Sequence, residues 1–284
     1  MTETIRASLQ LMRLARELRQ LREQAGLTAE SAADRLGWSR YKVTRIETCK
    51  TRPTPLDVAA ALNVYDAAAS ARAALMRLAH EARNSSRAWW TKYGDVLTGA
   101  FVGLEDAAAA IRSWQPQLVP GLLQTEEYAR AVISVLRPED SPELIERRVL
   151  ARMRRRELLD RDDAPRLQAV ISEASLVRPI GGWRTMGEQL RALATEERPN
   201  VELRVLPFDI GAHPGLEGPF VILGFPKDVY PDVVYLDHIN DDVLVEPLVA
   251  GYQRRWSSLM SASLDPGKSR ERIVQIMEAH SDQS

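Results

Sequence analysis

The segment from Leu27 to Arg52 constrains the fold of this 284-residue chain more than any other. Thr28 can cap a short helix that stops at Gly37, and Ser39 can cap another that runs to about Thr48. Gly37 can take the left-handed conformation that a tight turn requires. The segment therefore predicts two helices of about eight residues joined by a turn of three or four, which is the geometry of a helix-turn-helix.

The second of these helices is amphipathic. On a helical wheel Val43 and Ile46 form an apolar face, and the far side carries Tyr41, Thr44 and Arg45. Arginine can bind guanine through two hydrogen bonds, threonine can contact a base, and lysine and tyrosine reach phosphates. The pattern favours a DNA-reading face, although the solvated face of an ordinary helical bundle would contain the same residue types.

Three more helices are predicted around this motif by apolar spacings of three and four residues and by start and stop signals. They are residues 11–25, a helix beginning near Pro55, and residues 67–83. We therefore expect an all-α helix-turn-helix domain of five helices over residues 1–84 and a second domain over 85–284.

The second domain is expected to be α+β. Helices are predicted over 104–114, 125–136, 142–159, 183–197, 249–260 and 269–280, with a turn over 116–121. Residues 167–171 and 201–206 are β-prone and could be parallel strands joined by a crossover, and residues 220–225 and 233–237 resemble a hairpin. The result is a larger α+β domain with a small mixed sheet.

Charge differs between the two parts. Residues 1–84 hold 14 Lys and Arg against 9 Asp and Glu, a net of +5, and the remaining 24 basic and 30 acidic residues give −6. A basic domain joined to an acidic one is expected when the first part meets a polyanion, although so small an excess also arises by chance.

Composition argues against several other classes. There is no run of 18 apolar residues and no secretion signal at the start, so we expect a cytoplasmic, nucleoid-associated protein. Cys49 is the single cysteine and the four histidines are scattered, which predicts neither a disulfide nor a metal site. No nucleophile-elbow, dinucleotide-binding or P-loop motif occurs, so neither enzyme activity nor a cofactor is expected.

Three groups of residues leave alternatives open. Six arginines within 147–156 could bind phosphate, but an apolar stripe in the same helix favours an amphipathic structural role. His238, beside Asp237, Asp241 and Asp242, could serve acid–base chemistry or a metal, although such a group is more often a turn. Trp89 and Trp90 could pack in a core or line a cleft or an interface.

The N-terminal region closely resembles the Cro/cI-type (xenobiotic-response-element) helix-turn-helix domain. The resemblance is carried by Leu18, Leu21, Arg22, Gly26, Leu27, Thr28, Ala32, Ala33, Leu36, Gly37, Ser39, Val43, Ile46, Glu47 and Pro53. It implies that the DNA-binding residues are the two caps, Thr28 and Ser39, together with Arg40, Tyr41, Lys42, Thr44 and Arg45. It also implies a structural pair between Arg22 and Glu47.

Two positions depart from that pattern. Ala29 stands where the family usually has glutamine, so one expected DNA contact is missing. Cys49 stands where glycine is frequent, at a position that tends to need a positive φ, so backbone strain is expected there.

Residues 89–280 resemble the C-terminal domain of WhiJ-like, Scr1-family antitoxin-like regulators. The matching residues are Trp114, 119–125, 128–130, 152–156, 173–174, 189–190, 199–201, 206–208, Gly211 and 218–220. The two resemblances together imply a sequence-specific transcriptional regulator that binds double-stranded DNA as a homodimer, with a helix at about 39–48 in the major groove. The C-terminal domain would bind a small neighbour-encoded partner protein or an effector. The alternative is an antitoxin-like interaction module whose main role is to bind the small partner, with DNA binding as autoregulation.

Overall fold

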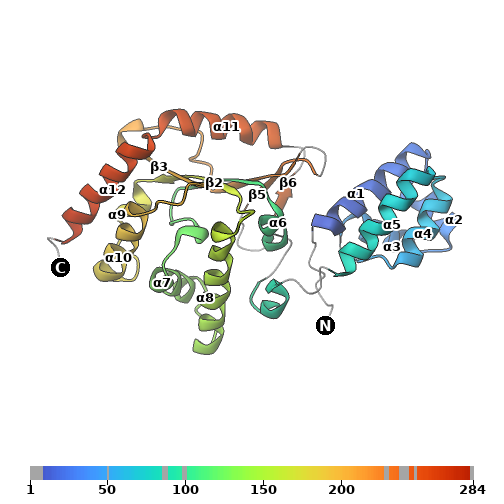
Figure 1. Ribbon diagram of the computed structural model, residues 1–284, viewed down its shortest axis with the longest axis horizontal. Coiled ribbons are helices and arrows are strands. Elements are labelled where there is room, and N and C mark those ends of the chain that lie inside the picture. Colours follow the sequence, from blue (N-terminus) through green and yellow to red (C-terminus); the bar gives the residue numbers. More distant parts are fainter. Residues whose placement is uncertain are drawn as a thin grey trace. The chain divides into compact units, whose positions relative to one another are not determined.

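The computed structural model describes residues 9–49, 51–84, 89–97, 101–226, 230–236, 243–245 and 248–281. The chain divides into two compact units, residues 1–107 and 108–284 (Figure 1). The sequence predicts a boundary after residue 84, whereas the first unit extends to residue 107. The additional segment includes α6 (Phe101–Ala107), which contacts α1.

The first unit begins with the five helices that the sequence predicted. They are α1 (Leu9–Gln24), α2 (Ala29–Leu36), α3 (Arg40–Glu47), α4 (Pro55–Val64) and α5 (Ala69–Asn84). A short 3-10 helix, η2 (Trp89–Tyr93), and α6 follow. Leu14, Leu18, Ile46, Val58 and Leu62 are among the buried residues of a shared core. This core joins α1, α3 and α4, and it confirms an all-α N-terminal region.

Local signals set the ends of these helices. The Thr28 hydroxyl accepts a hydrogen bond from the Ser31 amide and starts α2, and Gly37 ends it with a φ of 64°. A reciprocal capping box between Thr54 and Asp57, with Pro55 in the first turn, starts α4. The predicted left-handed glycine after α2 is therefore confirmed.

The second unit is built on a six-stranded mixed sheet with the order β3-β2-β1-β4-β5-β6 (Figure 1). The strands are β1 (Ala110–Gln115), β2 (Arg166–Ser172), β3 (Val201–Leu206), β4 (Phe220–Gly224), β5 (Val233–Leu236) and β6 (Val243–Val245). The first three run parallel to one another, and each later strand is antiparallel to its neighbour. The crossover from β2 to β3 and the β4–β5 hairpin are confirmed.

Helices cover both faces of this sheet. They are α7 (Glu126–Leu136), α8 (Pro142–Arg156), α9 (Ala174–Val177), α10 (Gly182–Ala194), α11 (Val249–Ala262) and α12 (Pro266–Ser281). Figure 1 shows α11 on one face and α7, α8 and α10 on the other. Trp256 and Leu259 of α11 share a core with Trp114 of β1, and α12 packs against α10 and β3. This arrangement agrees with the predicted α+β class.

The predicted helix over 104–114 is wrong. Residues 101–107 form α6, but residues 110–115 form β1, which pairs with β2 on one side and with β4 on the other. Leu104, Ala108 and Ile111 follow helical spacing, but pairing on both edges of β1 overrides it.

A loop after β3 contacts Trp114 of β1 through Gly215 and His213. The Trp114 indole N–H donates a hydrogen bond to the Gly215 carbonyl at 2.9 Å, and the Trp114 side chain is fully buried. A Cβ atom at position 215 would lie 2.6 Å from the indole ring, closer than real contacts allow. Only glycine therefore fits at this position without a shift of the loop.

Buried amides fix the segment between β1 and α7. Gln189 is fully buried, and its side chain accepts a hydrogen bond from the Thr125 amide and donates one to the Leu123 carbonyl. Gln124 donates to the Val119 carbonyl and accepts from Arg152. Several residues that carry the resemblance of the second unit therefore hold its fold together.

Candidate nucleic-acid interface

The candidate interface is centred on α3. The turn at Gly37 ends α2, and the cap at Ser39 starts α3 two residues later. The Ser39 hydroxyl accepts a hydrogen bond from the Lys42 amide at 3.2 Å. Val43 and Ile46 are 2% and 4% exposed and face the core. Because these two residues anchor one side of α3, its opposite side is left at the surface.

The surface side of α3 carries most of the residues expected to bind DNA. Arg40, Tyr41 and Thr44 are exposed, with the Tyr41 side chain 68% exposed. Ser39 and Thr28, the two caps, are exposed as well. The structure thus brings hydroxyl, phenol and guanidinium groups to one side of α3 and to the starts of both helices.

Arg45 is held in place by Tyr41 and Thr51. Its Nη1 donates a hydrogen bond to the Tyr41 hydroxyl at 3.0 Å, and its Nε donates to the Thr51 hydroxyl at 2.8 Å. The guanidinium also stacks over the Tyr41 ring, with 5.2 Å between the guanidinium carbon and the ring centroid. Such contacts restrict the side chain's rotamers before any ligand binds, which lowers the entropy lost on binding. Nothing in the sequence pattern singled out Thr51.

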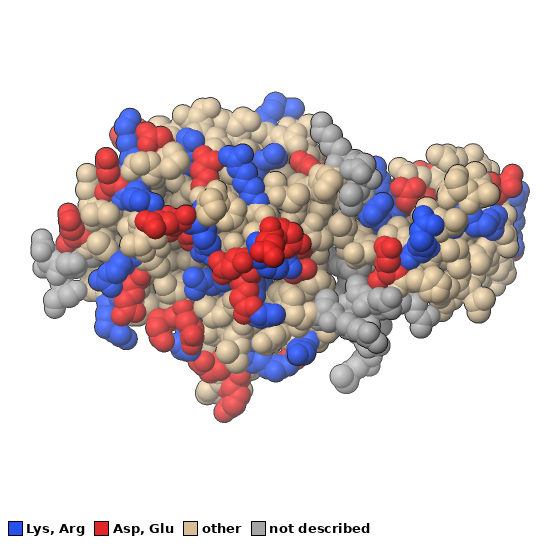
Figure 2. All heavy atoms as spheres, in the orientation of Figure 1, with Lys and Arg blue, Asp and Glu red and all other residues tan. Residues whose placement is uncertain are grey.

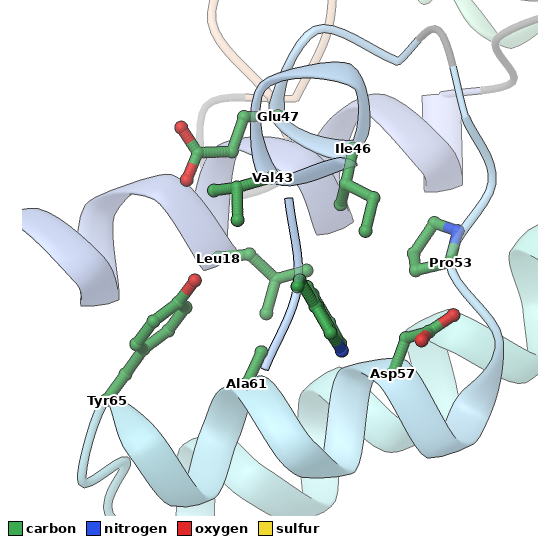
Figure 3. A pocket seen from close by; sticks show the side chains of 9 residues that line it. Leu18, Val43, Ile46, Glu47, Pro53, Asp57, Ala61 and Tyr65 are labelled. Atoms are coloured by element: carbon green, nitrogen blue, oxygen red, sulfur yellow. The ribbon is translucent and has the colours of Figure 1, made fainter. Parts of the chain in front are cut away.

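Lys42 differs from the other expected DNA contacts. Its Nζ lies 2.6 Å from Asp57 Oδ1 of α4 and 4.0 Å from the centroid of the Trp38 ring. Asp57 and Trp38 line a small pocket between α3, α1 and α4, and Figure 3 shows Asp57 at its edge near Pro53. Lys42 is therefore engaged within the domain, which its residue type did not reveal.

Arg22 and Glu47 join α1 to the last turn of α3. The Arg22 Nε and Nη2 atoms donate to the two Glu47 carboxylate oxygens at 2.7 and 2.9 Å, and Nη1 donates to the Leu27 carbonyl at 2.7 Å. Each side chain is 9% exposed. The pair fixes the end of α3 against α1.

Tyr65 stands close to this pair, and Figure 3 shows its hydroxyl on the same side of the pocket as Glu47. Burial, and secondly the charge of Glu47, raise the pKa of Tyr65 to about 12, although Arg22 acts in the opposite direction. The phenol is therefore neutral at physiological pH.

Cys49 adopts the strained conformation that the sequence predicted. Its φ is 58°, in the region that favours glycine. The thiol packs beside Leu11 and Ala82, and its Sγ lies 3.9 Å from the Leu11 carbonyl oxygen. Asp66 also has a positive φ, 52°, which no pattern in the sequence indicates.

Two of the alternative candidates lie among the described residues. In α8, Ile145 and Val149 are buried, and Arg148 pairs with Asp140. Figure 2 shows acidic and basic side chains interspersed over the visible face of the second unit, which favours the amphipathic interpretation of the arginines. Trp89 and Trp90 pack edge to face, and the Trp89 indole N–H donates to Asp106.

The described residues do not include His238 or the three aspartates near it, Asp237, Asp241 and Asp242. Within the described part of the chain, no three His, Cys, Asp or Glu residues are grouped to hold a metal ion. Among the described helices, none has the length and apolar character needed to cross a membrane.

Comparison with known families agrees with this geometry. A helix-turn-helix domain model matches residues 13–75, which lie within the first unit. A second model, described as a domain of unknown function (DUF5753), matches residues 98–275, more than half of the chain, and the chain belongs to this family. No curated protein and no solved structure matches the chain.

Proposed function

We propose that this protein is a sequence-specific transcriptional regulator that reads DNA with α3 in the major groove. The observation that carries the proposal is the side of α3 opposite Val43 and Ile46, where Tyr41 and Thr44 are exposed and Arg45 is preorganised. In helix-turn-helix proteins, a helix placed in this way after a tight turn lies in the major groove.

The groups on this side of the first unit have two kinds of role in this proposal. Arg45 reads a base through its guanidinium, and Thr44 contacts a neighbouring base or its methyl group. Arg40 and the hydroxyls of Ser39 and Thr28 bind phosphates, supported by the amide groups at the starts of α2 and α3. Phosphate contacts fix the register of α3 along the groove, and base contacts supply sequence preference.

The regulator acts as a homodimer in this proposal. One eight-residue helix reaches few base pairs, and two copies on half-sites about 34–36 Å apart would multiply the discrimination. The dimer would be expected to recognise an inverted repeat.

The second unit is proposed to bind a small partner protein or an effector and to have no catalytic role. Val135, Leu136 and Leu150 of the α7–α8 pair are more than half exposed, and exposed apolar side chains are what a partner would cover. Co-purification of a small neighbour-encoded protein that is lost in Leu136→Asp supports this role. Catalytic turnover that His238→Ala abolishes would contradict a non-enzymatic protein.

The test of DNA binding begins with a genome-wide chromatin-binding map, which yields the site for titration. Affinity for that site should fall steeply with salt, because the slope of log K against log salt is about −0.9 per neutralised phosphate. A scrambled duplex of equal length is the control and should bind more weakly at every salt concentration. A flat salt response, or equal binding of the two duplexes, rejects the proposal.

A further inference from the structure

We infer that Lys42 is a positioning residue that locks the recognition helix to α4, and not a phosphate contact. The Lys42 Nζ lies 2.6 Å from Asp57 Oδ1, and the Lys42 and Asp57 side chains are 36% and 18% exposed. The same ammonium lies 4.0 Å from the centroid of the Trp38 ring, which comes from the turn before α3. One cation thus joins the turn, α3 and α4.

Asp57 is a fixed acceptor for this lysine. Its Oδ2 accepts hydrogen bonds from the Thr54 amide at 2.9 Å and the Thr54 hydroxyl at 2.8 Å, which closes the capping box of α4. Burial acts to raise the pKa of Asp57, but the hydrogen bonds from Lys42 and Thr54 lower it below its ordinary value. The carboxylate therefore offers Oδ1 to Lys42 from a position that α4 itself sets.

The lock completes a two-point attachment of α3. Glu47 ties the last turn of α3 to Arg22 of α1, and Lys42 ties its first turns to Asp57 of α4. The two attachments are five residues apart, or about 7.5 Å along the helix axis. Two points of attachment fix the roll and the tilt of the helix, which one point cannot do. To contact a phosphate, Lys42 would have to give up one of them.

Asp57→Asn distinguishes the two roles by the sign of its effect on DNA affinity. Asparagine keeps an oxygen for the Thr54 amide but loses the charge that holds Lys42. If Lys42 served DNA directly, removing a nearby negative charge would leave affinity unchanged or raise it. The lock predicts that affinity for the specific site falls about threefold to tenfold.

Lys42→Gln is tested by the salt dependence of the same titration. A lost phosphate contact lowers the salt slope by about 0.9, whereas a lost lock weakens binding without changing the slope. Arg40→Gln, on the exposed side of α3, provides the slope change expected of a phosphate contact. Arg19→Gln removes the same charge from an exposed pair with Glu23 and controls for net charge. A fall in slope for Lys42→Gln that matches Arg40→Gln overturns the inference.

The role in binding rests on the proposed function, but the lock itself can be tested in the free protein. Hydrogen-exchange protection of α3 should fall about threefold to tenfold in Lys42→Gln and in Asp57→Asn, and no further in the double variant. Additive losses, or no loss in either variant, overturn the lock. If the wild-type protein binds no DNA, the proposed function fails and this measurement still decides the lock.

Discussion

Arg22 and Glu47 show how much one ion pair can matter when both partners are out of solvent. Three guanidinium nitrogens of Arg22 are engaged, two by Glu47 and one by the Leu27 carbonyl. The pair between Arg19 and Glu23 has a single hydrogen bond, at 2.9 Å, and its side chains are 60% and 50% exposed, so its net contribution is small.

Arg22→Ala should therefore lower the free energy of unfolding of the first unit by about 3–5 kcal/mol, because it leaves the Glu47 carboxylate buried and unpaired. Arg19→Ala is the matched control and should cost much less, because its pair with Glu23 is exposed. Urea unfolding followed by tryptophan fluorescence, with Trp38 as the reporter in this core, measures both. Equal losses in the two variants would contradict the assigned difference.

Arg45 carries the sharpest prediction about sequence preference. Arg45→Ala should cost about 1–3 kcal/mol of binding free energy and relax the preference at one or two base positions. Thr51→Val should reproduce a smaller part of that loss, because it removes only the hydrogen bond that orients the guanidinium. Binding selection from a randomised duplex library measures both effects. Uniform weakening across all sequences would make Arg45 a phosphate contact instead.

For single residues, the residue type predicts what a side chain can bind, but it does not predict which side chain it contacts in the fold. The pattern of α3 pointed to Lys42 and Arg45 alike as DNA contacts, because both are cations near one helix. The difference between them arises from Asp57, fifteen residues further along the chain, which meets Lys42 only after α4 has folded back. Asp66 is similar, since its positive φ follows from how the chain leaves α4.

At the scale of elements, the two-helix motif depends on backbone conformation at Gly37. Its φ is 64°, and a Cβ atom there would meet nothing within 4 Å, so any cost of a side chain comes from the backbone alone. Gly187 lies inside α10, where a Cβ atom would also meet nothing, but its φ is not in the positive range. Substitutions at these two positions therefore differ in backbone strain but not in steric contact.

Gly37→Ala should destabilise the first unit by about 1–2 kcal/mol, since an L-residue pays that amount in the left-handed region. Gly187→Ala should stabilise the second unit by about 0.5–1 kcal/mol, because alanine favours a helix interior. Hydrogen exchange measured on peptides from each unit resolves the two changes in the intact protein. Changes of the same sign would mean that backbone conformation does not govern these positions.

An element can be predicted from the sequence when the residues that determine it lie within the element itself. Helices α2 and α3 carry caps and stops in their own residues, so both of their ends are predicted to within a residue or two, and Pro55 predicts the start of α4 but not its end. Strand β1 carries no such signal, and its apolar spacing matches a helix. Its partners β2 and β4 begin at Arg166 and Phe220, so the pairing depends on chain far from it. Pairing between segments so far apart cannot be predicted from a short stretch of sequence.

At the scale of the whole molecule, each unit has its own buried core.

The proposed dimer requires two copies of α3 to meet the same face of the duplex. Inserting about half a helical turn between the half-sites, roughly 5 base pairs, should weaken binding at least about tenfold, because both copies can no longer engage together. A full-turn insertion of roughly 10 base pairs restores the facing and serves as the control. Equal affinity for both insertions, or a monomer by sedimentation of the complex, would contradict a dimeric reader.

The contact between Gly215 and Trp114 has a consequence for how this fold tolerates variation. The largest side chain of β1 meets the backbone of Gly215, and beside it the His213 ring, from a loop about a hundred positions away. In a library of random substitutions screened only for soluble expression, position 215 should accept almost nothing, whereas its exposed neighbour Leu216 should vary widely. Replacements that do survive at 215 should arrive together with a smaller aromatic ring at 114, which makes the two positions a linked pair in any future redesign of this domain.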